Sequence, residues 1–268
     1  MDKEELKKLA DDPDNIPGIY NYCDRWCERC PFTSRCLNYK MSEEKFGDQE
    51  SLDVNNAAFW EKLSETLHGT LELLKEMAEE HGIDLNSIDV EEAKQYHREF
   101  EDNNVVHVIE HLSKSYITTV DEWFDNDMYM IEDETNESDL DDHTASIDTL
   151  SEEDTVAMKD SVEVIRWYQH QIYVKLRRAL KSAQMEKTED WDDDQKDSDG
   201  SAKVALIGID RSISAWGKIL DYFSWQKRGI LNMIAHLKRL CKIIEIEFPN
   251  ARSFVRPGFD LTPKGHKR

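Results

Sequence analysis

Four of the chain's five cysteines lie within fourteen residues near the N-terminus, and this cluster constrains the fold more than any other feature. The four are Cys23, Cys27, Cys30 and Cys36, spaced C-x3-C-x2-C-x5-C. Thiolates are good ligands for soft metals, and one ion or cluster needs about four of them converging. The gaps between these cysteines are short enough to wrap one small inorganic core. The sequence therefore predicts a metal-binding loop.

Three interpretations of this loop differ in what the thiols do. Disulfides belong to oxidising compartments and small loop-rich domains, whereas this chain of 268 residues opens with polar residues rather than an apolar signal segment. Structural zinc usually uses two Cys pairs separated by a longer spacer. Because all four ligands are crowded together, the spacing favours a [4Fe–4S] cluster. Zinc remains the alternative cofactor, and disulfides or free thiols are a third interpretation.

The last three cysteines carry a resemblance to a known family. Cys27, Cys30 and Cys36 run C-x2-C-x5-C, and Pro31 follows the middle one. Residues 23–39 thereby resemble the [4Fe–4S] cluster loop of the helix-hairpin-helix DNA glycosylases, whose last three ligands have this spacing, often with that proline. In that family the first gap is six residues, whereas here Cys23 precedes Cys27 by a gap of three. The resemblance implies the cofactor alone, because no helix-hairpin-helix glycine hairpin followed by a catalytic aspartate occurs.

Aromatic and basic side chains surround the predicted ligands. The aromatic residues would shield a cluster from water, and the arginines would offset the negative charge of thiolate ligation. The alternative is that the aromatics only pack the loop against the next helix. The residues are Tyr20, Tyr22, Trp26, Phe32 and Tyr39, with Arg25, Arg29 and Arg35.

Composition narrows the classes of partner. A net charge of −23 argues against binding a phosphate backbone, which needs a basic surface, and so against a nucleic-acid partner. The sequence contains no run of about eighteen apolar residues, so no membrane-spanning helix is predicted. Clustered thiols and the polar N-terminus predict a cytoplasmic protein. The candidate partner is a basic or redox protein, and nothing in the sequence indicates an oligomeric state.

Apolar periodicity predicts an all-α fold, a bundle of about four long helices with a small N-terminal cysteine-rich metal loop. Hydrophobic content of 39 % and seven tryptophans suffice for a core. The region from 202 to 247 is expected as one very long helix or two joined near Arg228 and Gly229. The predicted organisation is an N-terminal segment at 1–54, a bundle at 55–248 with acidic insertions at 125–154 and 186–200, and a C-terminal tail at 249–268.

A second candidate site lies in the predicted bundle. Glu163 and His170 share the face of one helix that also carries Trp167, so partial burial is expected for both. Asp210 borders the apolar stripe of the next helix and could add a carboxylate to a site between helices. The alternative for all three is structural ion pairing, with Arg178 or Arg211 as partners for Asp210. Cys241 is expected to be a small core residue.

Three functions follow from these patterns. The first is a soluble [4Fe–4S] protein whose cluster either holds the N-terminus or passes electrons to a partner. The second is a metalloenzyme with a second site, of the di-iron type, around Glu163, His170 and Asp210. The third is a non-catalytic interaction protein with structural zinc and an acidic docking surface.

Overall fold

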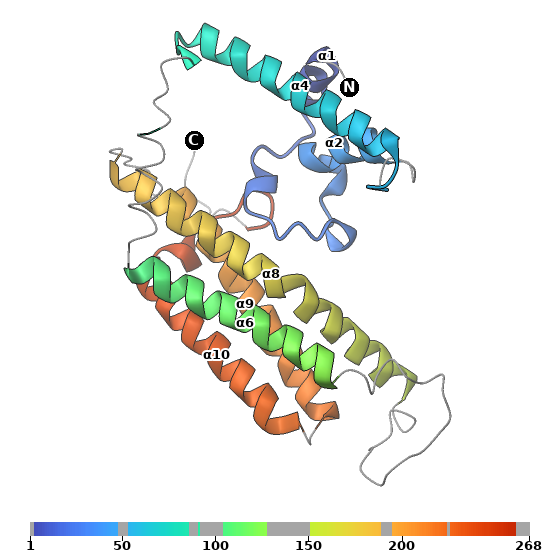
Figure 1. Cartoon of the computed structure of the whole chain (residues 1–268), viewed down its shortest axis with the longest axis vertical. Helices are drawn as coiled ribbons and strands as arrows, with labels where there is room; N and C mark the ends of the chain where they lie inside the picture. Colours follow the sequence, from blue (N-terminus) through green and yellow to red (C-terminus); the bar gives the residue numbers. More distant parts are fainter. Residues whose placement is uncertain are drawn as a thin grey trace. The chain divides into compact units, whose positions relative to one another are not determined.

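Helices account for all the regular secondary structure in the part of the chain that this computed structural model describes (Figure 1). The described residues are 3–47, 53–85, 91, 104–127, 151–188, 195–223 and 226–260. The chain forms two compact units, one made of residues 1–98 with 255–268 and the other of residues 99–254. The predicted all-α fold is confirmed. The predicted boundaries differ from this division, since the first long helix and the end of the chain both group with the cysteine loop.

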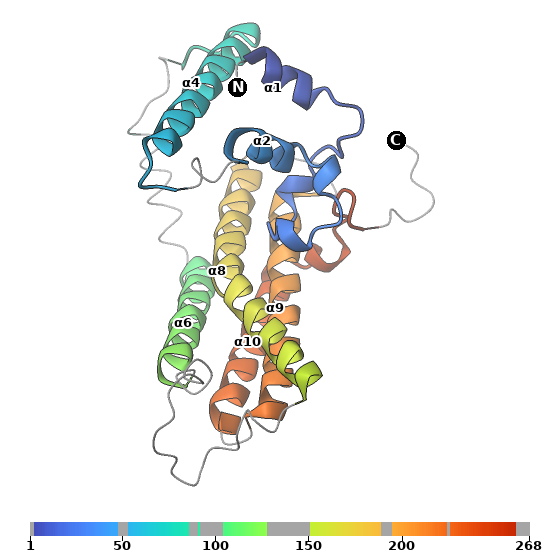
Figure 2. The same cartoon turned by 90° about the vertical axis from the view of Figure 1, so that its right-hand side faces the viewer.

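Four long helices make up most of what the structure describes of the larger unit. Successive helices run in opposite directions, and each packs against two neighbours, so that the order around the bundle is α6, α8, α9, α10 (Figures 1 and 2). This is the up-and-down arrangement that helix-period apolar stripes favour. The helices are α6 (Asn104–Asp127), α8 (Glu152–Thr188), α9 (Asp197–Tyr222) and α10 (Lys227–Glu247).

Aromatic side chains from α6 and α9 meet in the middle of the bundle. The rings of Trp123 and Trp216 pack edge to face with centroids 5.0 Å apart. The Trp216 indole N–H donates to the Tyr116 hydroxyl at 3.0 Å. Burial raises the pKa of Tyr116 to about 12. The predicted apolar periodicity is confirmed on α6, α8 and α9, since Ile109, Val120, Ile165, Ile172, Leu206 and Ile209 are all buried.

Small residues on α9 let α8 approach closely. Ala202, Ala205 and Gly208 are all buried on this face. A Cβ placed on Gly208 would lie 2.8 Å from Cδ1 of Tyr168, which is closer than carbon atoms pack. Tyr168 is itself 1 % exposed, so its ring has little room to move. Glycine at this position therefore sets the distance between the two helices.

We expect Gly208→Ala to lower the free energy of unfolding by about 1 kcal/mol, although alanine favours a helix. The propensity gain is about 1 kcal/mol, and the overpacking cost in a filled core is about 1–3 kcal/mol. Gly217 in the same helix is the matched control, because a Cβ there meets nothing within 4 Å. Gly217→Ala should stabilise the protein in the same urea titration. If both variants shift the midpoint in the same direction, close packing at Gly208 is refuted.

The two predicted acidic insertions are partly helical. Residues 125–127 belong to α6, and 128–150 lie outside the described residues. The second insertion begins within α8 and ends within α9. There Glu186 accepts hydrogen bonds from the backbone N–H and the hydroxyl of Ser198 at 2.9 and 2.6 Å, while Arg178 pairs with Asp197 at 2.5 Å. The predicted acidic insertion extends to residue 200, but α9 begins within it. Glu186 accepts hydrogen bonds from the first turn of α9, and Asp197 in that turn is paired with Arg178.

The predicted helix over 202–247 is two helices, since α9 ends at Tyr222 and α10 begins at Lys227, so the junction predicted at 228–229 lies inside α10. Gly229 lies inside α10, whereas Phe223 follows the last residue of α9 and has a buried ring.

The start of the predicted C-terminal tail is also packed. Ala251 and Phe254 are buried, and the Lys203 ammonium donates to the Phe254 carbonyl at 2.5 Å. Within the described residues, no helix combines the length and apolar content needed to cross a membrane.

In its described residues, the smaller unit contains three α-helices and the cysteine loop. They are α1 (Lys3–Ala10), α2 (Leu37–Phe46) and α4 (Ala57–Glu80). Helix α2 continues through the polar residues after Tyr39 to Phe46. Helix α4 falls in the range 55–248 predicted for the bundle, yet it belongs to this smaller unit, and Leu67, Leu74 and Met77 are each more than half exposed. Periodicity identified an amphipathic helix, but it did not reveal that α4 lies outside the bundle.

Candidate metal centre

The backbone around the cysteines turns sharply between the first two of them. Arg25 has φ 60°, the only positive value at a non-glycine residue in the described ranges. Trp26 follows with φ −82° and ψ 74°, and the Cys27 N–H donates to the Arg25 carbonyl at 3.0 Å. This geometry is an inverse γ-turn. A left-handed residue followed by a γ-turn compresses the C-x3-C gap, and strained backbone of this kind concentrates at functional sites.

Two short 3-10 turns place the remaining cysteines. The turn at Cys27–Arg29 leads into Cys30, whose N–H donates to the Cys27 carbonyl at 3.1 Å. The turn at Thr33–Arg35 leads into Cys36, which immediately precedes α2. In both turns a cysteine is the residue that ends the turn in extended conformation. The C-x2-C and C-x5-C gaps are therefore each closed by one local hydrogen-bonded turn.

Polar contacts anchor the loop to the segment that precedes it. The Ile16 N–H donates to the Arg35 carbonyl at 3.0 Å, and the Arg35 guanidinium donates to the Asp14 carbonyl at 3.0 Å. From α2, the Lys40 ammonium pairs with Asp12 at 2.6 Å and holds the pKa of that carboxyl below its usual value. The segment at 12–16 and α2 thus hold both sides of the loop.

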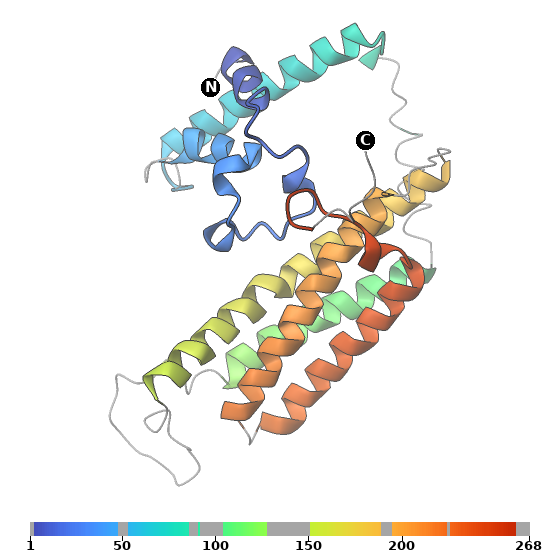
Figure 3. The same ribbon diagram turned by 180° about the vertical axis from the view of Figure 1, so that it is seen from behind.

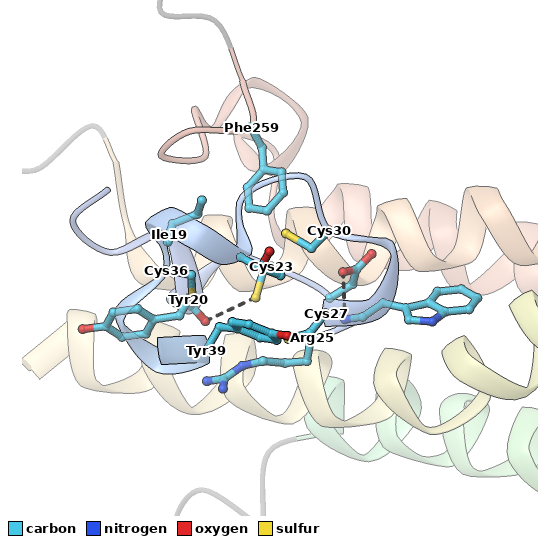
Figure 4. Close-up of a pocket in the computed structure, with 12 residues that line it drawn as sticks. Ile19, Tyr20, Cys23, Arg25, Cys27, Cys30, Cys36, Tyr39 and Phe259 are labelled. Atoms are coloured by element: carbon cyan, nitrogen blue, oxygen red, sulfur yellow. Dashed lines mark hydrogen bonds between the residues drawn. The ribbon is translucent and has the colours of Figure 1, made fainter. Parts of the chain in front are cut away.

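All four N-terminal cysteines line one hollow (Figure 4). It encloses about 310 Å³, including the part open to solvent, and twelve residues line it. Eleven of these come from residues 19–39, and the twelfth is Phe259. Each of the four thiols is partly exposed, and none forms a disulfide. The loop therefore presents four free thiols around a shared space.

The thiols influence one another electrostatically. Burial raises the pKa of Cys27, and Cys23 and Cys36 raise it further because neighbouring thiolates repel. Burial likewise raises the pKa of Cys30, while the Phe32 N–H, which donates to its Sγ at 3.4 Å, acts in the opposite direction. The Cys23 thiol donates to the Tyr20 carbonyl at 3.6 Å. The positive charge of a bound metal would offset this repulsion, so four thiols suit a metal ion or a metal cluster.

The described side chains do not form a compact site for a single metal ion. No three His, Cys, Asp or Glu residues among them stand close enough together to hold one ion. This applies to the second candidate site as well as to the cysteines. Glu163 and His170 are exposed, so the expected partial burial was wrong. Asp210 pairs with Arg252 at 2.5 Å instead of with Arg178 or Arg211, and the structure does not assemble a site from these three residues.

Arg252 explains why Asp210 lies where it does. This arginine also pairs with Glu245 at 2.9 Å and donates to the sulfur of Cys241 at 3.3 Å. Arg252 thereby ties the start of the C-terminal tail to carboxylates of α9 and α10. Cys241 is only partly buried beside this cluster, rather than a fully buried core residue. The contacts around Asp210 are thus ion pairs between α9, α10 and the following turn.

The predicted shielding residues divide into two groups. Tyr20, Trp26 and Tyr39 line the hollow, whereas Tyr22 and Phe32 are absent from its lining. Among the arginines only Arg25 lines it, while Arg29 stacks over the Trp26 ring at 4.0 Å. These aromatic side chains lower the polarity around the thiols.

Sequence reasoning did not predict four of the lining residues, and Phe259 is the one of these that lies far from the cysteines in the sequence; the others are Ile19, Asp24 and Thr33. The Phe259 ring points into the hollow above Cys23 and Cys30 in Figure 4. The centroids of Phe259 and Phe32 lie 5.2 Å apart, edge to face. Pro257-Gly258 was a visible turn signal, but nothing in the local pattern connects the end of the chain to residue 32.

Comparison with known proteins adds no assignment: no protein-family model, curated protein or solved structure matches this chain.

Proposed function

We propose that this protein holds a [4Fe–4S] cluster through Cys23, Cys27, Cys30 and Cys36. The observation that carries the proposal is that all four thiols line one hollow. Cubane clusters take four cysteine thiolates, one on each iron, and therefore need space between the ligands. Zinc would instead draw four sulfurs to about 2.3 Å from a single point. A hollow between the thiols favours the cluster, with zinc as the alternative that the first experiment distinguishes.

The surroundings of the thiols support the same cofactor. The Phe32 N–H points at the sulfur of Cys30, and hydrogen bonds to ligating sulfurs tune cluster potentials. Tyr20, Trp26 and Tyr39 supply an aromatic wall around the thiols. Such a cluster would supply one-electron chemistry or structural cross-linking, and this chain's residues supply the ligands, the N–H donor and the shielding.

Electron transfer to a protein partner is the role we propose for the cluster, with anchoring of the N-terminal segment as the alternative role. The four cysteines are only partly buried, so electrons would have a short path to the surface. A net charge of −23 favours a partner with a basic surface and speaks against nucleic acid. Free thiols kept for metal ligation are typical of the cytoplasm, which is the location we propose.

Anaerobic purification followed by an absorption spectrum and a count of iron, sulfide and zinc tests the cofactor. We expect roughly four irons and four sulfides per chain and a broad absorption band at about 400 nm. One zinc and no colour would replace the cluster with a structural ion. A reversible redox titration would then support electron transfer, whereas a cluster that cannot be reduced without loss would support the anchoring role.

A further inference from the structure

The end of the described chain forms a self-contained turn. The backbone N–H of Arg256 donates to the Asp260 carboxylate at 2.9 Å, and its guanidinium donates to the same group at 3.2 and 3.1 Å. The Arg256 guanidinium also lies over the Phe259 ring, 4.9 Å from its centroid. These contacts fix the orientation of Phe259 from within the turn itself. We define residues 256–260 as the C-terminal turn.

Glycine at position 258 lets this turn approach the cysteine loop closely. Gly258 has φ +77°, where residues with a side chain are strained. A Cβ there would lie 3.0 Å from Cδ1 of both Ile16 and Ile19. Pro257 in turn lies near Gly18, 3.9 Å from the position of a Cβ on that glycine. Figure 3 shows the two segments side by side, although they lie at opposite ends of the sequence.

Phe259 contacts the cysteine hollow in two ways. Its ring forms part of the wall that the four cysteines also line. It also packs edge to face on Phe32, whose backbone N–H donates to the Cys30 sulfur. Removing the ring would therefore open the hollow to water and loosen the residue that supplies the N–H donor.

We infer that the C-terminal turn is the lid of the cysteine hollow and that Phe259 controls how far water and small oxidants reach what the hollow holds. This inference rests on the proposed function, because it assigns a positioning and shielding residue to the same site. Water around a thiolate-ligated cluster stabilises its more negative reduced state, so exposure raises the reduction potential. The lid would keep the potential low and the cluster stable in air.

The test compares Phe259→Ala and Phe259→Leu with the wild-type full chain. We first measure thiol labelling of the metal-free protein by mass spectrometry, with Cys241 as an internal reference outside the hollow. Phe259→Ala should label Cys23 and Cys30 several-fold faster at an unchanged rate for Cys241, and leucine should give an intermediate rate. In the loaded protein, Phe259→Ala should raise the potential; a tenfold increase in the reduced-to-oxidised ratio corresponds to about 59 mV for one electron.

Two further variants keep the outcome clear. Phe46→Ala removes an aromatic from the same unit but not from the hollow, because Phe46 packs against Phe59 with centroids 6.0 Å apart. It should leave labelling and potential unchanged. Gly258→Ala should behave like Phe259→Ala, since the added methyl group displaces the turn.

Different results would refute the proposed lid and the proposed cluster. Wild-type protein without iron would refute the proposed function, while the labelling rates would still test the lid. Wild-type protein with iron whose labelling and potential do not change in Phe259→Ala would refute the lid alone. Equal acceleration in Phe46→Ala would also refute it, since that result indicates general loosening of the unit.

Discussion

Cys30→Ala should abolish the absorption band at about 400 nm and reduce iron from roughly four per chain to near none. Cys30 lines the hollow, and its sulfur accepts the Phe32 N–H, so its removal deletes both a ligand and the best-defined hydrogen bond to a sulfur. The free energy of metal binding contributes to folding in small metal-binding segments. Loss of the metal should therefore also lower the stability of the N-terminal unit. Metal analysis and limited proteolysis between residues 11 and 47 measure the two effects.

Cys241→Ala is the matched control for this change. Cys241 is the one cysteine outside the N-terminal stretch, and it lies beside Arg252 and Glu245 in the other unit. Its variant should keep the full iron content and the wild-type proteolysis pattern. Equal loss of metal in both variants, or in neither, would contradict the assignment of ligands to the loop.

Local patterns predicted the parts of this protein that depend on local physics. Core positions of α8 such as Ile165, Ile172 and Leu176 follow from apolar spacing along one helix, and all three are buried. The start of that helix is likewise built from neighbours in sequence, since the Asp154 N–H donates to the Ser151 hydroxyl at 3.1 Å. The four thiols of the loop line one hollow because the gaps between them in the sequence are short. These features need only neighbours in sequence.

Features that depend on distant segments were not predictable in the same way. An amphipathic pattern shows that α4 has an apolar face, but it does not show which element covers that face, and Leu67 is 56 % exposed. Acidic residues at 186 and 197 look like a solvated loop until their partners, Ser198 and Arg178, are known. Phe259 belongs to the candidate site only because a glycine turn seats it against Ile16 and Ile19. Each case is decided by a contact between distant positions.

The second large effect concerns the bundle, where Trp216→Ala should lower the free energy of unfolding by about 3–5 kcal/mol. Trp216 is fully buried, packs against Trp123 and donates to Tyr116, so its loss leaves a cavity and removes the partner of a buried hydroxyl. Far-UV circular dichroism during urea denaturation measures the change without relying on tryptophan emission. Tyr116→Phe should cost less, about 1–3 kcal/mol, because it leaves only the indole N–H unpaired.

Trp60→Ala is the control for that substitution, since Trp60 is 58 % exposed in the smaller unit and should cost under about 1 kcal/mol. Iron content adds a second criterion. Every residue that lines the cysteine hollow comes from residues 19–39 or is Phe259, and none lies in 99–254. The folded fraction of Trp216→Ala should therefore keep its metal. Equal midpoint shifts for the two tryptophan variants would mean that the bundle core is not centred on Trp216, whereas metal loss in Trp216→Ala would show that cluster retention depends on the bundle.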